Sequence, residues 1–174
     1  MRVVGGEARG RRLTAPPGRG TRPTTDRVRE AIFDMLGSLD AVEEADVADL
    51  FAGSGALGIE ALSRGARSAT FVERDRGAAG CIRANLTATG LAGTHARVVK
   101  ADVMGWLDTA SPFSLVLADP PFAFDEWPLI LAKLVPVAGL LVYEASVDFE
   151  PGPAWEVLRL KHYGSSVVTL ARPS

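Results

Sequence analysis

The segment Asp49-Leu-Phe-Ala-Gly53-Ser-Gly55-Ala-Leu-Gly58 decides how this chain is expected to fold. It overlaps the end of an apolar run at residues 47–51, typical of a buried strand, and leads into a helical pattern at residues 57–63. Its glycines follow the spacing G-x-G-x-x-G, and Glu73 lies 20 residues beyond Gly53, at the end of the next apolar run. This combination of a strand, a glycine turn, a helix and an acid at this spacing matches the nucleotide-binding fingerprint. In that fingerprint the acid accepts hydrogen bonds from the ribose hydroxyls.

Short apolar runs alternate with helical stretches along the rest of the chain. Strands are expected at residues 47–51, 69–72, 97–99, 115–118, 140–143, 156–161 and 166–170. Helices are expected at residues 57–63, 77–89, 104–107 and 126–134, with Gly90 ending the second of them. This alternation predicts an α/β fold with a mostly parallel seven-stranded sheet and helices on both faces. Only a tight turn at Tyr163-Gly164 separates the last two runs, so the sheet should finish with an antiparallel hairpin.

The first 37 residues follow a different pattern. Residues 2–4 and 11–13, separated by a glycine-containing stretch, predict a small β-hairpin. After a linker rich in proline and glycine, Thr24-Thr25-Asp26 offers N-cap residues for a helix to about residue 36, with Gly37 as its stop. The helix should dock through an apolar face made of Val28, Ile32, Met35 and Leu36. We therefore expect an N-terminal extension over residues 1–37 and a main domain over residues 38–174.

The net charge of −2 conceals an asymmetry between these two parts. Residues 1–29 contain eight arginines against Glu7 and Asp26, a charge of +6, which leaves −8 for the remainder. Guanidinium groups bind phosphate in a bidentate manner, so the pattern favours a polyanion-binding arm over a solvated, flexible tail. The arginines expected to contact a polyanion are Arg2, Arg9, Arg11, Arg12, Arg19 and Arg22.

Composition indicates where in the cell the protein is expected to work and whether a metal site is expected. No apolar stretch reaches the roughly 20 residues of a membrane span, and we expect no signal peptide or membrane association. The single cysteine, Cys81, cannot form an internal disulfide and fits a reducing cytoplasm. His95 and His162 are the only histidines and lie far apart in sequence, so we expect no metal site.

Four carboxylates are expected at the carboxyl ends of successive strands. They are Asp49, Glu73, Asp102 and Asp119. In an open parallel sheet such ends line one crevice, and a dinucleotide pyrophosphate would be repelled there. S-adenosylmethionine has no phosphate and carries a sulfonium and an ammonium group. The charge pattern therefore favours this cofactor over a nicotinamide dinucleotide.

Individual cofactor contacts follow from position. Asp49 should face the methionine ammonium, Glu73 the ribose hydroxyls, and Asp102 the adenine amine. The turn residues Phe51, Gly53, Ser54 and Gly55 should pack close to the cofactor. Val103 and the stem of Arg74 could cover the adenine faces, and Thr24 or Arg27 could bind the methionine carboxylate.

The tetrapeptide Asp119-Pro120-Pro121-Phe122 follows the strand expected at residues 115–118. Two prolines stop the strand and hold the acid on a stiff backbone, with an aromatic ring three residues further on. The exocyclic amine of a nucleobase is a poor nucleophile because its lone pair is delocalised into the ring. Asp119 and the Pro120 carbonyl could accept hydrogen bonds from the two N–H groups of this amine while Phe122 stacks on the base. Phe124 could be a second ring, although core packing is its expected role.

On these residues the chain resembles the class I methyltransferases, and more specifically the RsmD-type 16S rRNA guanine-N2 methyltransferases. The segments that carry the resemblance are residues 2–6, 9–13, 22–30, 49–58 and 119–122. The resemblance implies a Rossmann-like, cytoplasmic enzyme that uses S-adenosylmethionine to methylate one guanine of 16S rRNA within a small-subunit assembly particle. It implies that the arginine arm contacts RNA, and we expect a monomer. Ala8 stands where the family often has a bulky residue, and the region after Phe122 is short.

Three other functions fit part of the pattern. An amino-methyltransferase acting on another RNA, on DNA or on a protein amide would use the same tetrapeptide, but the chain has no room for a DNA target-recognition domain. A nicotinamide-dependent oxidoreductase is disfavoured by Asp49. A non-catalytic RNA-binding protein could retain the fold.

Overall fold

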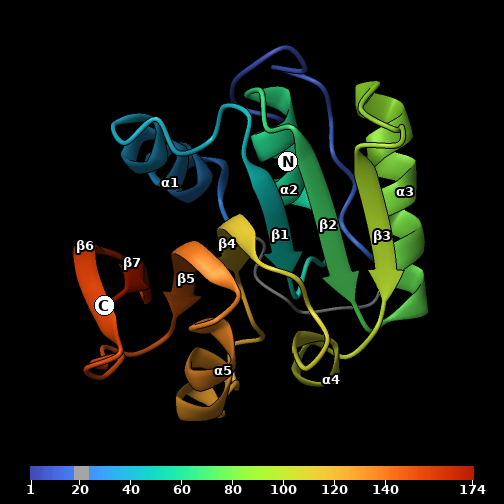
Figure 1. Ribbon diagram of the computed structural model, residues 1–174. Coiled ribbons are helices and arrows are strands. Elements are labelled where there is room, and N and C mark those ends of the chain that lie inside the picture. Colours follow the sequence, from blue (N-terminus) through green and yellow to red (C-terminus); the bar gives the residue numbers. More distant parts are fainter. Residues whose placement is uncertain (18–23) are drawn as a thin grey trace.

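The glycine motif connects β1 (Asp46–Leu50) to α2 (Ala56–Ser63) in the computed structural model, which describes residues 1–17 and 24–174 (Figure 1). One sheet organises the chain, with the strand order β3-β2-β1-β4-β5-β7-β6. The remaining strands are β2 (Ser68–Glu73), β3 (Ala96–Lys100), β4 (Phe113–Ala118), β5 (Ala138–Ala145), β6 (Trp155–Tyr163) and β7 (Ser166–Pro173). The other helices are α1 (Asp26–Gly37), α3 (Arg76–Thr89), α4 (Val103–Leu107) and α5 (Trp127–Leu134).

Strands β1 to β5 run parallel, and β7 is antiparallel to both β5 and β6. This confirms the predicted mostly parallel sheet with an antiparallel C-terminal hairpin. The chain builds outward from β1 through β2 to β3 and then returns to place β4 on the other side of β1. The strand order therefore reverses between β1 and β4, which is where open α/β sheets bind their ligands.

Helices cover both faces of the sheet, as the alternating pattern predicts. Buried side chains of α1, α2 and α3 share one core with one face, and those of α4 and α5 share a second core with the other. Gly58 shows how closely α2 approaches the sheet, because a Cβ at this position would lie 2.4 Å from the ring of Phe71 in β2. The third glycine of the motif is thus required for helix–sheet packing.

The N-terminal segment pairs with itself and then packs on the body. Arg2 bridges Arg12 in antiparallel fashion, and Val3 N–H donates to the Arg11 carbonyl at 2.9 Å, so the predicted hairpin forms over a short distance. Its backbone reaches α2, where the Glu60 carboxylate accepts from the N–H groups of Val4 and Gly5 at 2.9 and 2.7 Å.

Helix α1 begins as predicted, with Thr25 as the N-cap whose Oγ1 accepts from Val28 N–H at 3.3 Å. Its predicted apolar face is buried in full. The helix ends at Gly37, but Gly37 does not adopt the left-handed conformation expected of a glycine cap. Ser38 caps the helix in the right-handed conformation, and its Oγ donates to the Met35 carbonyl at 2.7 Å. The left-handed residue is Asp40 (φ 49°), after which Ala41 N–H donates back to the Leu36 carbonyl at 3.1 Å.

Candidate active site

A cavity of about 990 Å³ opens at the carboxyl ends of the parallel strands. All four of the predicted carboxylates, Asp49, Glu73, Asp102 and Asp119, line it. The cavity wall also includes most of the other predicted site residues: Thr24, Phe51, Gly53, Ser54, Arg74, Val103, Pro120, Pro121 and Phe122. The fold thereby brings residues from Met1 to Ser166 into one cavity.

The turn after β1 is shaped by three residues in the left-handed region. Phe51 and Gly53 both have a φ of 57°, and Gly55 has a φ of 78°. The turn presents Gly53 and Ser54 to the cavity, whereas Gly55 is buried behind it and does not line the wall. Gly55 instead packs beside Ile82 of α3, which a Cβ would approach to 3.0 Å.

Two of the carboxylates are fixed by backbone N–H groups around the turn. Asp49 Oδ2 accepts from Gly58 N–H at 2.9 Å, so this acid also holds the first turn of α2. Glu73 accepts from Gly53 N–H through Oε2 at 2.9 Å and from Asp75 N–H through Oε1 at 2.8 Å. Carboxylate oxygens have further lone pairs, so Glu73 retains the capacity to accept from a ligand.

Asp102 is the N-cap of α4. Its Oδ2 accepts from Met104 N–H at 3.1 Å and Gly105 N–H at 3.3 Å. The side chain is exposed on the cavity wall next to buried Val103, and Arg74 lies on the same wall after β2. An acid, an apolar surface and a guanidinium stem therefore meet at one end of the cavity.

Burial and mutual repulsion act on the acids nearest the turn. Burial raises the pKa of Asp49 well above its ordinary value, and repulsion by Asp119 and Glu73 raises it further, while the hydrogen bond from Gly58 opposes the shift. Such a cluster is stabilised by a positive charge between its members. The cavity is therefore suited to a cationic ligand.

The Asp119–Phe122 segment forms the wall opposite the glycine turn. Pro120 is buried, whereas the ring of Phe122 is 80% exposed at the rim. Ser146 Oγ, from the segment after β5, donates to the Phe122 carbonyl at 3.4 Å. A large aromatic ring presented to solvent beside a cavity is available to stack on a flat ligand.

Phe124 packs in the aromatic cluster, as its expected core role requires, and its part as a second stacking ring stays a prediction. Its ring packs edge-on against Trp127 at a centroid distance of 5.1 Å and against Phe51 at 5.3 Å, and it lines the cavity as well. Phe124 thus supports the floor of the cavity through Phe51.

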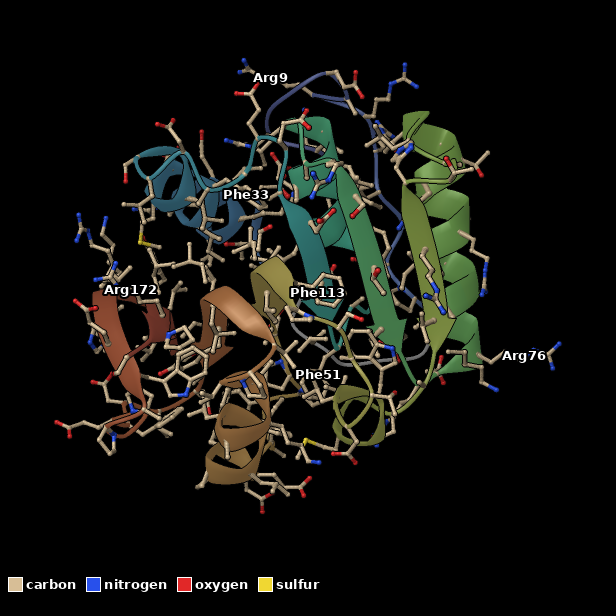
Figure 2. The ribbon with its side chains drawn as sticks, in the orientation of Figure 1. Arg9, Phe33, Phe51, Arg76, Phe113 and Arg172 are labelled. Carbon is tan, nitrogen blue, oxygen red and sulfur yellow. The ribbon has the colours of Figure 1, made fainter. Side chains whose placement is uncertain are left out.

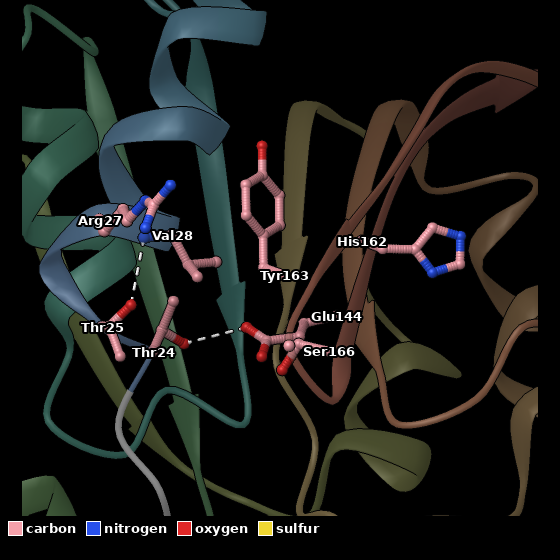
Figure 3. A pocket seen from close by; sticks show the side chains of 9 residues that line it. Thr24, Thr25, Arg27, Val28, Glu144, His162, Tyr163 and Ser166 are labelled. Carbon is pink, nitrogen blue, oxygen red and sulfur yellow. Dashed lines mark hydrogen bonds between the residues drawn. The ribbon is translucent and has the colours of Figure 1, made fainter.

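Of the two residues predicted to bind a methionine carboxylate, Thr24 lines the large cavity and Arg27 does not, although both line a smaller pocket beside it. In the large cavity, Thr24 Oγ1 donates to Asp119 Oδ2 at 2.5 Å. The smaller pocket has a volume of about 290 Å³ and is also lined by Thr25, His162 and Tyr163 (Figure 3).

Sequence reasoning missed Glu144. This acid lies near the end of β5, lines both the large cavity and the smaller pocket, and is within 3.3 Å of Thr24 Oγ1. The sequence contains the pattern that would have identified it, because Glu144 comes at the end of a predicted strand in the same way as the other four acids. Met1, Ala15 and Pro16 also reach the cavity and could not have been assigned to it from the sequence.

The arginines of the arm that lie within residues 1–17 do not line the cavity. Arg2, Arg9, Arg11 and Arg12 are exposed, and Arg9 lies at the end of the molecule away from Phe51 (Figure 2). Arg11 Nη1 donates to the Ala88 carbonyl of α3 at 3.4 Å. Arg19 and Arg22 lie outside the described residues.

Metal ligands and membrane spans are both missing from residues 1–17 and 24–174. No group of histidine, cysteine and acidic side chains in these two ranges could hold a metal ion. None of the helices there has the length and apolar character needed to cross a membrane.

The family model for Conserved hypothetical protein 95 matches residues 1–172. The chain belongs to this family. Ribosomal RNA small subunit methyltransferase D of Escherichia coli (strain K12) is 48% identical over 123 residues, which cover 70% of this chain and 60% of that protein. The chain thus aligns with less than two thirds of this relative. A candidate rRNA methyltransferase, YlbH, of Bacillus subtilis (strain 168) is 44% identical over 138 residues, covering 77% of this chain and 73% of YlbH.

The solved structures agree with the fold. A candidate methyltransferase from Escherichia coli, yhhF, superposes with a TM-score of 0.86 at 37% identity, over 100% of this chain and 98% of that one. The resemblance to the RsmD-type family and the Rossmann-like methyltransferase fold are both confirmed.

Proposed function

We propose that this protein transfers a methyl group from S-adenosylmethionine to the exocyclic N2 amine of a guanine in 16S rRNA. The observation that carries the proposal is the position of Asp119, Pro120 and exposed Phe122 on the wall of an acidic cavity. The family relative from Escherichia coli, named Ribosomal RNA small subunit methyltransferase D, supports rRNA as the substrate class.

The cavity fits the proposed cofactor in size and charge. Its volume of about 990 Å³ is at the upper end of small-molecule sites. Asp49 and Asp119 would face the cationic groups, Glu73 would accept from the ribose hydroxyls, and Asp102 from the adenine amine. When bound, the cofactor supplies an electrophilic methyl group. Arg74 is the one cationic side chain among the described residues of the wall, which leaves little to bind a pyrophosphate.

The chain's own residues would activate and orient the amine. Asp119 and the Pro120 carbonyl would accept from the two N–H groups, which directs the nitrogen lone pair toward the methyl group. Phe122 would stack on the base, whose extrusion from RNA costs a few kcal/mol. Asp119 would then take the proton that methylation makes acidic.

The N-terminal extension, residues 1–37, would bind RNA phosphates through its exposed arginines. Its hairpin lies beside the body, so contacts there can orient a large particle while one nucleotide reaches the cavity. We propose either 16S rRNA or a small-subunit assembly particle as the substrate. We propose that the protein acts as a monomer, supported by the four predicted carboxylates lining one cavity within a single chain.

Methyl transfer to small-subunit particles from cells that lack this protein tests the proposal. The wild-type protein should incorporate radiolabelled methyl groups, and mass mapping should locate them on N2 of a guanine. Asp119→Ala should lose the activity, whereas Asp108→Ala, which removes an exposed acid paired with Lys133, should retain it. Full activity in Asp119→Ala would exclude the mechanism, and labelling of another atom would exclude the guanine-N2 specificity.

A further inference from the structure

A single hydroxyl lies between two carboxylates beside the cavity. Thr24 Oγ1 is 2.5 Å from Asp119 Oδ2 and 3.3 Å from Glu144 Oε2, the second contact being drawn in Figure 3. The three residues come from distant parts of the chain: Thr24 precedes α1, Asp119 follows β4, and Glu144 lies near the end of β5. Thr24 is 8% exposed and lines both the large cavity and the smaller pocket.

The three oxygen groups have one hydrogen too few for two full hydrogen bonds. Two hydrogen bonds among three oxygen groups require two hydrogens, and a threonine hydroxyl supplies one. With both carboxylates ionised, Thr24 donates its one hydrogen mainly to Asp119, and the longer 3.3 Å contact with Glu144 can only share that same hydrogen in a weak three-centre bond. One proton on either carboxyl group completes both contacts.

We propose that Asp119 and Glu144 act as one unit that holds a single proton across Thr24, with Glu144 as a positioning residue behind Asp119. The inference rests on the proposed function and extends it to the fate of the proton. Asp119 has a second oxygen, Oδ1, with which to accept from the substrate amine while Oδ2 remains with Thr24.

The reaction balances on this unit. The amine nitrogen uses its lone pair to form the new C–N bond, and the electron pair of the broken C–S bond stays on sulfur. The nitrogen then keeps the electrons of one N–H bond while its proton passes to Asp119. The proton arrives on Oδ1, so the Asp119 carboxyl group then turns over to donate this O–H to Thr24 Oγ1, and the hydroxyl in turn donates to Glu144.

The smaller pocket gives this unit a route to solvent. Thr24, Glu144 and Ser166 line both hollows, so they form the wall between the cavity and the pocket. The proton can therefore leave on the Glu144 side after the product departs, without passing through the cavity.

Other charged groups lie near the unit. Asp49 of β1 interacts electrostatically with both Asp119 and Glu73, while Arg27 and His162 line the smaller pocket, where His162 Nε2 is 3.4 Å from Asp148 Oδ2. Burial, followed by repulsion from Glu144, raises the pKa of Asp119 to about 7, and the Thr24 hydrogen bond opposes the rise. Glu144 and Thr24 thus act on Asp119 in opposite directions.

The test is the pH dependence of a single methyl-transfer turnover on saturating small-subunit particles. In the wild type the rate should fall on the acid side as Asp119 becomes protonated before reaction, at a pH below the pKa of about 7 of the empty site, because the positive charges of the bound cofactor lower the pKa of this carboxyl. Glu144→Gln removes the repulsion, so its acid limb should move to lower pH by roughly one unit. Thr24→Val removes the stabilising donor, so its acid limb should move to higher pH, and Thr24→Ser should restore the wild-type profile.

Glu156→Gln is the matched control, because it removes one exposed carboxylate charge from the same sheet, at the β6 edge. Its profile should equal that of the wild type. Shifts of Glu144→Gln and Thr24→Val in the same direction, or no shift in either, would overturn the proton-sharing unit while methyl transfer by the wild type stands. Absence of methyl transfer by the wild type at every pH would instead overturn the proposed function.

Discussion

At the scale of single residues, the acids of the cavity have different tasks although they share one sequence signature. Asp49, Glu73 and Asp102 accept from backbone N–H groups and so hold the turns around the cavity. Asp119 is contacted by a threonine side chain instead. A carboxylate engaged by a rotatable hydroxyl can exchange a proton more readily than one fixed by backbone N–H groups. The contacts therefore single out Asp119 as the reactive acid.

Asp119→Asn should lose activity and be more stable than the wild type at high pH. The folded-state pKa of Asp119 is raised to about 7 from an ordinary value of 3.8, so this carboxyl stabilises the fold below about pH 4 and loses that contribution as the pH rises to about 7. The amide that replaces it would not titrate. We compare the free energy of unfolding of the variant with that of the wild type at each pH. The difference in favour of the variant should be roughly 1–3 kcal/mol larger at pH 8 than at pH 4. Urea denaturation at the two pH values measures the free energy of unfolding of both proteins. If the variant and the wild type differ by the same amount at both pH values, Asp119 is not a buried carboxylate that destabilises the fold when ionised.

Phe122→Ala tests the exposed ring. A base–aromatic stack is worth about 1–3 kcal/mol, so kcat/KM on particles should fall by roughly 5- to 150-fold. Because the ring is 80% exposed, the free energy of unfolding should change by less than about 0.5 kcal/mol. Phe122→Trp should keep most of the activity. Leu129→Ala, which truncates another exposed apolar side chain on α5, is the control and should leave both quantities unchanged.

At the scale of elements, a buried ion pair joins the hairpin, α1 and α2. Arg29 and Glu60 are both fully buried, with Arg29 Nε 3.4 Å from Glu60 Oε2. Glu60 also accepts from the hairpin backbone at Val4 and Gly5, and from Arg64 Nε at 2.8 Å. The hairpin is therefore anchored by charge-assisted contacts as well as by apolar packing.

Glu60→Gln should loosen this junction. It leaves the Arg29 guanidinium buried with less compensating charge, and breaking such a pair costs about 3–5 kcal/mol. Glu156→Gln, which breaks an exposed pair with Arg172, should cost at most about 1 kcal/mol. Chemical denaturation measures both, and amide exchange of Val4 and Gly5 should accelerate in Glu60→Gln alone. Equal costs in the two variants would show that burial adds nothing to the Glu60 contacts.

Elements were predictable from the sequence where a local physical cause defined them. The glycine motif, the Tyr163-Gly164 turn and the Gly90 cap of α3 each depend on a few adjacent residues, and each forms as expected. The end of α1 was placed correctly at Gly37 but its cap was not, because Ser38 and left-handed Asp40 take the part expected of the glycine. The place of Arg27 could not be read from the sequence, because it depends on how α1 packs against the β6–β7 turn.

At the scale of the whole molecule, charge is divided between two surfaces. The cavity is acidic, whereas the N-terminal hairpin displays arginines at a distance from it (Figure 2). A polyanion would be repelled at the cavity and attracted at the hairpin. The cofactor and the RNA backbone would therefore be directed to different sites by the sign of the charge alone.

The last prediction tests this division through salt dependence. Arg11→Ala combined with Arg12→Ala removes two exposed guanidinium groups from the hairpin, and each lost phosphate contact should reduce the slope of log affinity against log salt by about one unit. Fluorescence binding to small-subunit particles between low and moderate salt measures the slope. Arg159→Ala with Lys161→Ala is the control, because it removes the same charge from β6 at the opposite side of the sheet from β3. If both double variants flatten the slope equally, binding follows net charge and the hairpin has no special role. If neither does, the hairpin arginines serve the fold alone.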